Sequence, residues 1–152
     1  MTTSSALPTL FGRATAVLGE HATLREIVDQ LENVCRSSGD GGAQPAAHHA
    51  QLIEQFRNLL FKHFAAEEDP GYFGTLVKAM PALGGEISRL CMEHQVFRLE
   101  VQRLIELSGA ANKRDEFGVR LASLLDRFRE HERSENLLIQ EYFLRDDGEG
   151  ND

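Results

Sequence analysis

At two places in the chain a histidine stands four residues before a glutamate, and these pairs carry the strongest chemical signal in the sequence. His63 precedes Glu67, and His131 precedes Glu135. On an α-helix, residues four apart lie on the same face, one turn from each other. Both pairs continue stripes of apolar residues at helical spacing, so they point toward the expected core. Ionisable side chains rarely face a core unless something pairs with them, and a metal ion is one such partner.

Two further histidines share a second local pattern. His21 and His94 are each followed by an apolar residue three positions later and by an arginine four positions later. In chain order the sequence therefore reads His, His-x3-Glu, His, His-x3-Glu, which is a weak internal repeat. His48 and His49 match no other half of this repeat and lie near the start of a predicted helix, where we expect them to be exposed.

Apolar residues recur at helical spacing through most of the chain, and no alternating pattern indicates a sheet. The predicted long helices cover about residues 9–36, 45–68, 87–108 and 115–144, with a short helical piece over 72–80. Glycine, serine and proline clusters separate them. Four amphipathic helices with short links predict an all-α fold, an antiparallel up-down-up-down four-helix bundle. We expect one domain over residues 1–152, with about the first eight residues and the acidic tail from about 146 loose.

Charge and composition narrow the class of partner. The formal net charge is -8 and the sequence pI is about 5.2, which argues against nucleic acid or an anionic membrane surface. No apolar run reaches the roughly 20 residues of a membrane span. The N-terminus lacks a basic start followed by an apolar segment, so no signal peptide is expected.

Two cysteines are too few for a disulfide framework. Cys35 and Cys91 lie on apolar stripes, where thiols usually behave as small core residues, and a redox role is the less favoured alternative. These features predict a cytoplasmic protein.

The bundle explains how the histidines meet. Each of the four helices has one of these histidines on its inner apolar stripe. Glu67 and Glu135 lie one turn, about 6 Å, beyond their partner histidines. The second and fourth helices run in the same direction, so both carboxylates can reach a common level and bridge two ions. A single histidine on an apolar stripe is more often an ordinary core residue, but four such histidines favour a metal site. Nitrogen and oxygen ligands without thiolate suit iron, manganese or zinc.

At these residues the chain resembles the hemerythrin-like, or HHE cation-binding, family over about residues 11–142. That family is a four-helix bundle with a non-haem di-iron centre. The resemblance implies that His21 and His63 ligate one iron and that His94 and His131 ligate the other. Glu67 and Glu135 would bridge the two, and an oxo or hydroxo group would complete the bridge.

One departure from the family pattern matters. Oxygen-carrying hemerythrins have a His-x3-His pair on the third helix, whereas Leu90 and Arg98 stand four residues before and after His94 here. Two histidines per iron look more like bacterial proteins that act in repair of iron centres and in nitric oxide stress. Those proteins usually carry an additional N-terminal domain with a cysteine motif, which has no counterpart in this sequence.

Three functions remain open at this point. The leading hypothesis is a di-iron protein that binds dioxygen, nitric oxide or peroxide in sensing, storage or stress defence. The alternatives are a redox enzyme or iron donor to damaged centres, and an interaction module that a metal only stabilises. Whether the chain is an enzyme and how it oligomerises are not predicted. Tyr142 is interpreted mainly as a packing residue, and Glu68, Glu93 and Glu130 as solvated charges.

Overall fold

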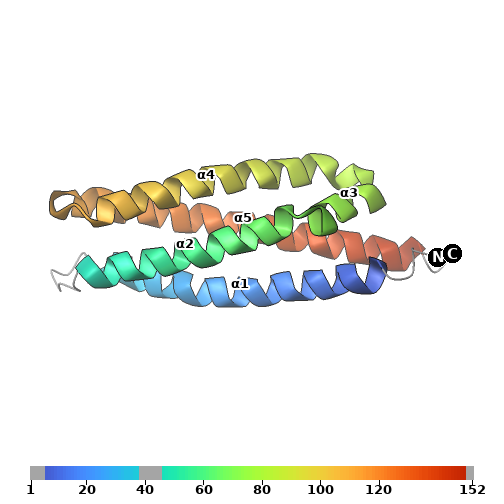
Figure 1. Cartoon of the computed structure of the whole chain (residues 1–152), viewed down its shortest axis with the longest axis horizontal. Coiled ribbons are helices and arrows are strands. Elements are labelled where there is room, and N and C mark those ends of the chain that lie inside the picture. Colours follow the sequence, from blue (N-terminus) through green and yellow to red (C-terminus); the bar gives the residue numbers. More distant parts are fainter. Residues whose placement is uncertain (1–5, 38–45, 150–152) are drawn as a thin grey trace.

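A computed structural model describes residues 6–37 and 46–149 of the chain. Long helices dominate it: α1 (Ala6–Ser37), α2 (Ala46–Glu68), α4 (Gly84–Ser108) and α5 (Arg114–Glu149). They lie side by side along one common axis (Figure 1). Each packs on two others, in the order α1, α2, α4, α5 and back to α1. No strand occurs among the described residues. The predicted all-α four-helix bundle is confirmed.

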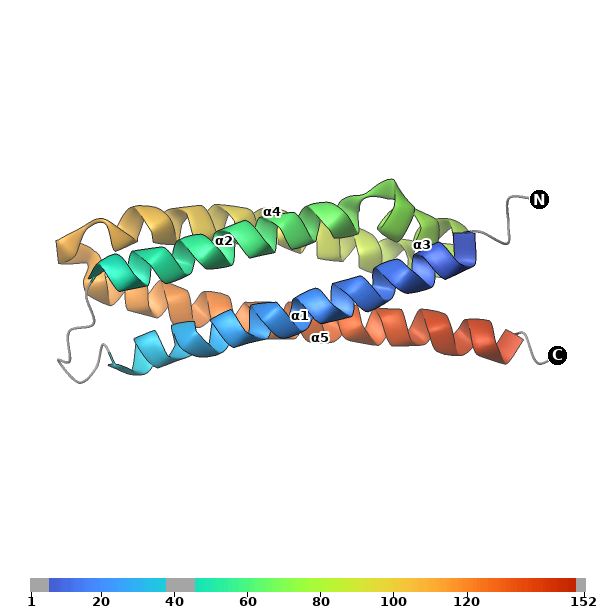
Figure 2. The same cartoon turned by 60° about the horizontal axis from the view of Figure 1, so that its bottom comes forward.

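The two connections that the structure describes carry local helical turns. A π-helix, η1 (Pro70–Gly74), then α3 (Thr75–Ala79) and a 3₁₀ turn, η2 (Pro81–Leu83), link α2 to α4, and η3 (Ala111–Lys113) links α4 to α5. Figure 2 shows the η1–α3 segment at one end of the bundle, beside the start of α1. The short helical piece predicted over 72–80 is present, but it is divided between the π-helix η1 and the helix α3.

Two helix ends differ from the sequence prediction. α1 begins at Ala6 rather than near residue 9, with Pro8 in its first turn, where its missing amide hydrogen costs nothing. α5 continues to Glu149 rather than ending near residue 144. No glycine or proline occurs between Gly118 and Gly148 to end the helix earlier. The expected loose residues 1–5 and 150–152, and most of the glycine-rich break at 37–42, lie outside the described residues.

The interior divides into two apolar clusters with a polar layer between them. On α1, α4 and α5 a ligand-type residue separates a member of one cluster from a member of the other, for example His94 between Leu90 and Phe97. The buried apolar residues of α2 belong to the first cluster alone, and Glu67 lies near its end. The first cluster lies toward the α4–α5 connection and includes Leu60, Phe64, Phe97, Leu124 and Phe128. The second lies toward α3 and includes Val17, Tyr72, Leu76, Leu90, Leu138 and Tyr142. The apolar stripes thus place the histidines and glutamates at one level.

Candidate metal centre

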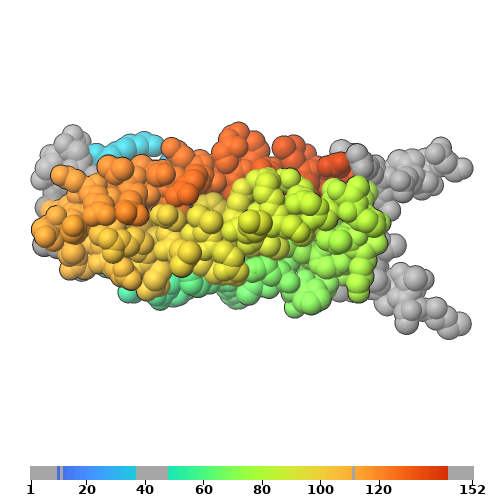
Figure 3. Space-filling view, turned by 90° about the horizontal axis from the view of Figure 1, so that it is seen from above, coloured from blue at the N-terminus to red at the C-terminus, as the bar shows by residue number. Residues whose placement is uncertain are grey.

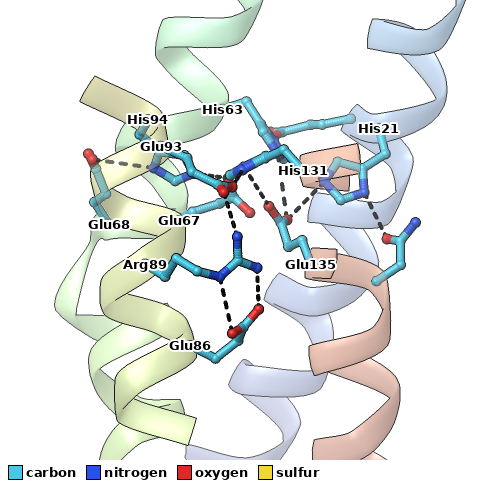
Figure 4. A network of polar contacts seen from close by, with 12 residues as sticks. His21, His63, Glu67, Glu68, Glu86, Arg89, Glu93, His94, His131 and Glu135 are labelled. Atoms are coloured by element: carbon cyan, nitrogen blue, oxygen red, sulfur yellow. Dashed lines mark hydrogen bonds and ion pairs between the residues drawn. The ribbon is translucent and has the colours of Figure 1, made fainter. Parts of the chain in front are cut away.

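The polar layer contains all six residues that the sequence singled out. Their exposed fractions are 3% or less, so the whole layer is buried. All four long helices contribute, and the side chains converge on one another (Figure 4). The members of the layer are His21, His63, Glu67, His94, His131 and Glu135.

Within the layer the residues form two groups suited to hold a metal ion. One consists of His21, His63, Glu67 and Glu135, and the other of His94, His131 and Glu135. In each group the nitrogen and oxygen atoms available as ligands lie within 4.8 Å of one another. Two imidazoles thus belong to each group.

The two carboxylates lie between the histidine pairs. Glu135 directs Oε1 at His21 Nε2, 2.9 Å away, and Oε2 at His131 Nε2, 3.6 Å away. Glu67 Oε1 is 3.2 Å from His63 Nε2 and 3.4 Å from His94 Nε2. Each carboxylate therefore reaches both groups, which is the geometry that a bridging ligand needs.

Several atoms of this layer have no hydrogen-bond partner in the described structure. They include both carboxylate oxygens of Glu67 and of Glu135, and Nε2 of His94 and of His131. Leaving buried carboxylate oxygens unsatisfied is costly, and these atoms are electron-pair donors that point at one another. Divalent cations satisfy such a set, so the residues present fit a metal centre.

Comparison with known protein families agrees with a metal centre at these residues. A model of the family described as the hemerythrin HHE cation-binding domain matches residues 14–143. The chain belongs to this family. Membership implies metal binding, and the matched span contains the whole polar layer. Neither the curated proteins nor the solved structures contain a match.

This hemerythrin-family chain has no third imidazole beside His94. Leu90, one turn earlier on α4, is fully buried in the second core cluster. Arg98, one turn later, binds Glu68 at 2.8 Å and lies over the Phe64 ring at 5.5 Å from its centre. Of the two positions one turn from His94 on α4, Leu90 faces the interior, and it supplies no ligand atom.

Around the layer, an oxygen atom lies near Nδ1 of each of its four histidines. His63 Nδ1 is 2.6 Å from Glu20 Oε2, and His131 Nδ1 is 2.6 Å from Glu93 Oε1. The other two pairs are longer: His21 Nδ1 to Asn136 Oδ1 at 3.1 Å, and His94 Nδ1 to Glu68 Oε2 at 3.6 Å. At His63 and His131 the partner is a carboxylate, which only accepts, so it holds the proton on Nδ1 and leaves the Nε2 lone pair facing the layer.

The interpretation of Glu68 and Glu93 as solvated charges is therefore wrong, whereas Glu130 is exposed as expected. The carboxylates of Glu68 and Glu93 lie near histidines on neighbouring helices. Sequence spacing within one helix does not reveal such a contact. Glu20 was missed for the same reason, since its partner lies 43 residues away. A glutamate next to a ligand-type histidine in the sequence was the available signal for Glu20 and Glu93.

The charges within the layer are strongly coupled. Burial and the neighbouring Glu135 raise the pKa of Glu67 well above its ordinary value. Burial opposes ionisation of Glu135 too, but its contacts with Glu67 and His21 prevail and lower its pKa to about 2. Burial and His131 lower the pKa of His94 to about 4, so this imidazole is neutral at physiological pH. For His21, contact with Glu135 outweighs burial and raises the pKa.

These shifts predict that apparent metal affinity rises steeply with pH. Glu67 and His21 hold protons more tightly than usual, and a cation must displace them, so affinity falls as pH drops through their raised pKa values. Each displaced proton changes the apparent affinity by about tenfold per pH unit. Competition titrations between about pH 6 and pH 8 measure the slope. A pH-independent affinity would contradict this proton count.

The remaining candidates lie apart from the layer. His48 is exposed as expected, but His49 is half-buried and stacks on Phe117. Tyr142 belongs to the second core cluster. Cys35 and Cys91 pack against the two clusters, and burial raises the pKa of both thiols, which disfavours the reactive thiolate.

One surface hollow approaches the layer from outside. It has a volume of about 440 Å³ and lies between α4 and α5, on the side shown in Figure 3. Its lining includes the buried Phe97 and His131 and the exposed Arg89 and Arg127. Through this hollow, solvent comes close to the His131 side of the polar layer.

Proposed function

We propose that this hemerythrin-family chain is a non-haem di-iron protein that binds dioxygen, nitric oxide or peroxide, in sensing, storage or stress defence. The observation that carries the proposal is the position of Glu135, whose two carboxylate oxygens point at histidines of different pairs. A carboxylate so placed suits two cations close together, as in two-metal sites with separations of about 3.5–4 Å.

In this proposal the ligands divide by group. His21 and His63 would hold one ion and His94 and His131 the other. Glu135, which belongs to both groups, and Glu67, which lies between His63 and His94, would be shared. Iron, when bound, supplies redox chemistry and coordination positions for a small ligand. Manganese and zinc suit the same donors and are possible substitutes.

The protein's own contribution is to orient the donors and to exclude water. Oxygen atoms of Glu20, Glu93 and Asn136 hold three of the imidazole rings by Nδ1. Apolar clusters close the layer on both sides, and their packing limits solvent entry. This setting keeps bulk water away from the donor atoms and fixes their orientation.

A redox enzyme or an iron-donating repair protein is the second candidate. The buried Leu90 beside His94 favours it, because two histidines per ion leave more positions open to water and oxidants than three do. No helix of the described chain is long and apolar enough to cross a membrane. We propose the cytoplasm as its compartment because both thiols serve as packing residues.

Metal content and optical spectra test the proposal most directly. Two irons per chain, with oxygen-to-iron charge-transfer bands that disappear on air-free reduction, are the expected result. Reversible oxygenation would favour ligand binding, and turnover with an added reductant would favour the enzyme. Full stability without metal and no visible spectrum would favour a plain interaction module and contradict the di-iron proposal.

The outer carboxylates give a further prediction. Glu93→Gln removes the negative charge of the carboxylate that lies beside His131 Nδ1, so we expect metal affinity to fall about tenfold. Glu86→Gln is the matched control, because Glu86 shares the partner Arg89 but touches no histidine. Competitive titration with a chelator measures both. Equal affinities in the two variants would show that Glu93 does not support the site.

A further inference from the structure

Tyr72 has a buried hydroxyl group without a hydrogen-bond partner in the described structure. The side chain is 1% exposed, and Oη belongs to the buried polar atoms that nothing satisfies. Buried tyrosine hydroxyls normally find a partner, because an unsatisfied donor loses its hydration without compensation. An orphaned donor in a well-packed interior therefore requires an explanation.

This hydroxyl lies beside the polar layer. Tyr72 is in η1, five residues after Glu67, and the charges of Glu135 and Glu67 act on its phenol. The neighbouring Phe73 connects it physically to the layer: its ring stacks on Tyr72 at 5.3 Å and on His94 at 6.2 Å between centres. Tyr72 thus adjoins the layer on its α3 side.

A break in the helix precedes Tyr72. In an uninterrupted α-helix, a residue five positions after Glu67 would be rotated about 140° away from it. Here α2 ends at Glu68, Asp69 has an extended backbone with ψ 134°, and Tyr72 lies in the π-helix η1 that follows. Such π-helical turns are frequent at functional sites. Asp69 stabilises the turn, since its Oδ1 accepts from Gly71 N at 2.7 Å and from Arg13 at 3.0 Å.

We propose that Tyr72 donates a hydrogen bond to the small ligand that the metal centre takes up. The inference deepens the proposed function and rests on it. The ligand class is a small anion or diatomic molecule with an oxygen or nitrogen acceptor atom. Burial, Glu135 and Glu67 raise the pKa of this phenol above its ordinary value, so it stays protonated and able to donate.

The test compares Tyr72→Phe with Tyr142→Phe in the metal-loaded protein. Tyr142 is a matched control, because it is a buried tyrosine of the same core cluster, located on α5. Azide is the probe, and its binding is followed by the optical change of the iron centre. With metal content unchanged, we expect Tyr72→Phe to bind azide about tenfold more weakly than the parent, and Tyr142→Phe to bind it within about twofold.

A second measurement uses metal-free protein. Tyr72→Phe should unfold at the same temperature as the parent or higher, because it deletes an unsatisfied hydroxyl. A lower unfolding temperature would show that the phenol has a partner within the protein and would overturn the inference. Unchanged azide affinity at full metal content would overturn it too. So would a phenolate-to-iron band in the parent that Tyr72→Phe lacks, since Tyr72 would then be a ligand.

Metal content, measured before the azide titration, separates failure of this inference from failure of the proposed function. A parent protein that takes up no metal would overturn both proposals. A parent with two irons and an azide affinity that Tyr72→Phe leaves unchanged would overturn only the role of Tyr72.

Discussion

Glu135→Ala is expected to lose both metal ions while keeping the helical bundle. The carboxylate of Glu135 points one oxygen at His21 and the other at His131, so its removal deletes a ligand of each ion. It also deletes negative charge that offsets two cations in a buried layer. Glu67→Ala should have a similar effect, since Glu67 lies between His63 and His94.

A single histidine change should be milder. His94→Ala removes a ligand of one ion only, so we expect one metal ion per chain to remain at moderate metal concentration. Metal analysis after gel filtration, together with circular dichroism to verify helix content, measures the difference. Glu130→Ala is the control: it removes a glutamate of the same helix that faces solvent and pairs with Arg133. Retention of both metals in the two glutamate variants would contradict the bridging assignment.

The sequence was informative about this site because the site follows helical periodicity. Four apolar stripes predicted the bundle, and each stripe contained one histidine, so their convergence followed from topology alone. His63 and Glu67 share a helix face at an interval of four residues, and His131 and Glu135 repeat it. Backbone regularity was sufficient to place these side chains at one level.

What could not be predicted depends on contacts between helices or on irregular backbone. Glu68 reaches His94 from α2 to α4, and Glu93 reaches His131 from α4 to α5. By its position on its own helix, each of these glutamates points away from the apolar stripe. The long, flexible glutamate side chain nevertheless reaches the histidine of the next helix. Tyr72 follows a break in the helix at Asp69 and lies in the π-helix η1, so the α-helical period assumed in reading the sequence does not place it.

The last prediction concerns the histidine that oxygen-carrying relatives have and this chain lacks. The reduced, iron-loaded protein should oxidise quickly in air, because two imidazoles per ion leave coordination positions open to water and anions. Leu90→His introduces an imidazole one turn before His94, at a fully buried position in the cluster adjoining the layer. If that imidazole adds a third nitrogen ligand, fewer positions remain open and autoxidation should slow.

We expect Leu90→His to lengthen the half-life of the reduced protein by roughly ten- to a hundredfold, or about 1.4–2.7 kcal/mol in activation free energy. Stopped-flow mixing of the air-free reduced protein with oxygen measures the rate. Leu90→Met, which keeps the approximate volume without adding an imidazole, controls for altered packing. Equal rates in the two variants would show that position 90 does not reach the ions. In the unmodified protein, a spectrum of reversible oxygenation that lasts for hours would contradict the open-coordination argument. Within the proposed ligand-binding function, reversible oxygen carriage would then be favoured over a role in sensing or stress defence.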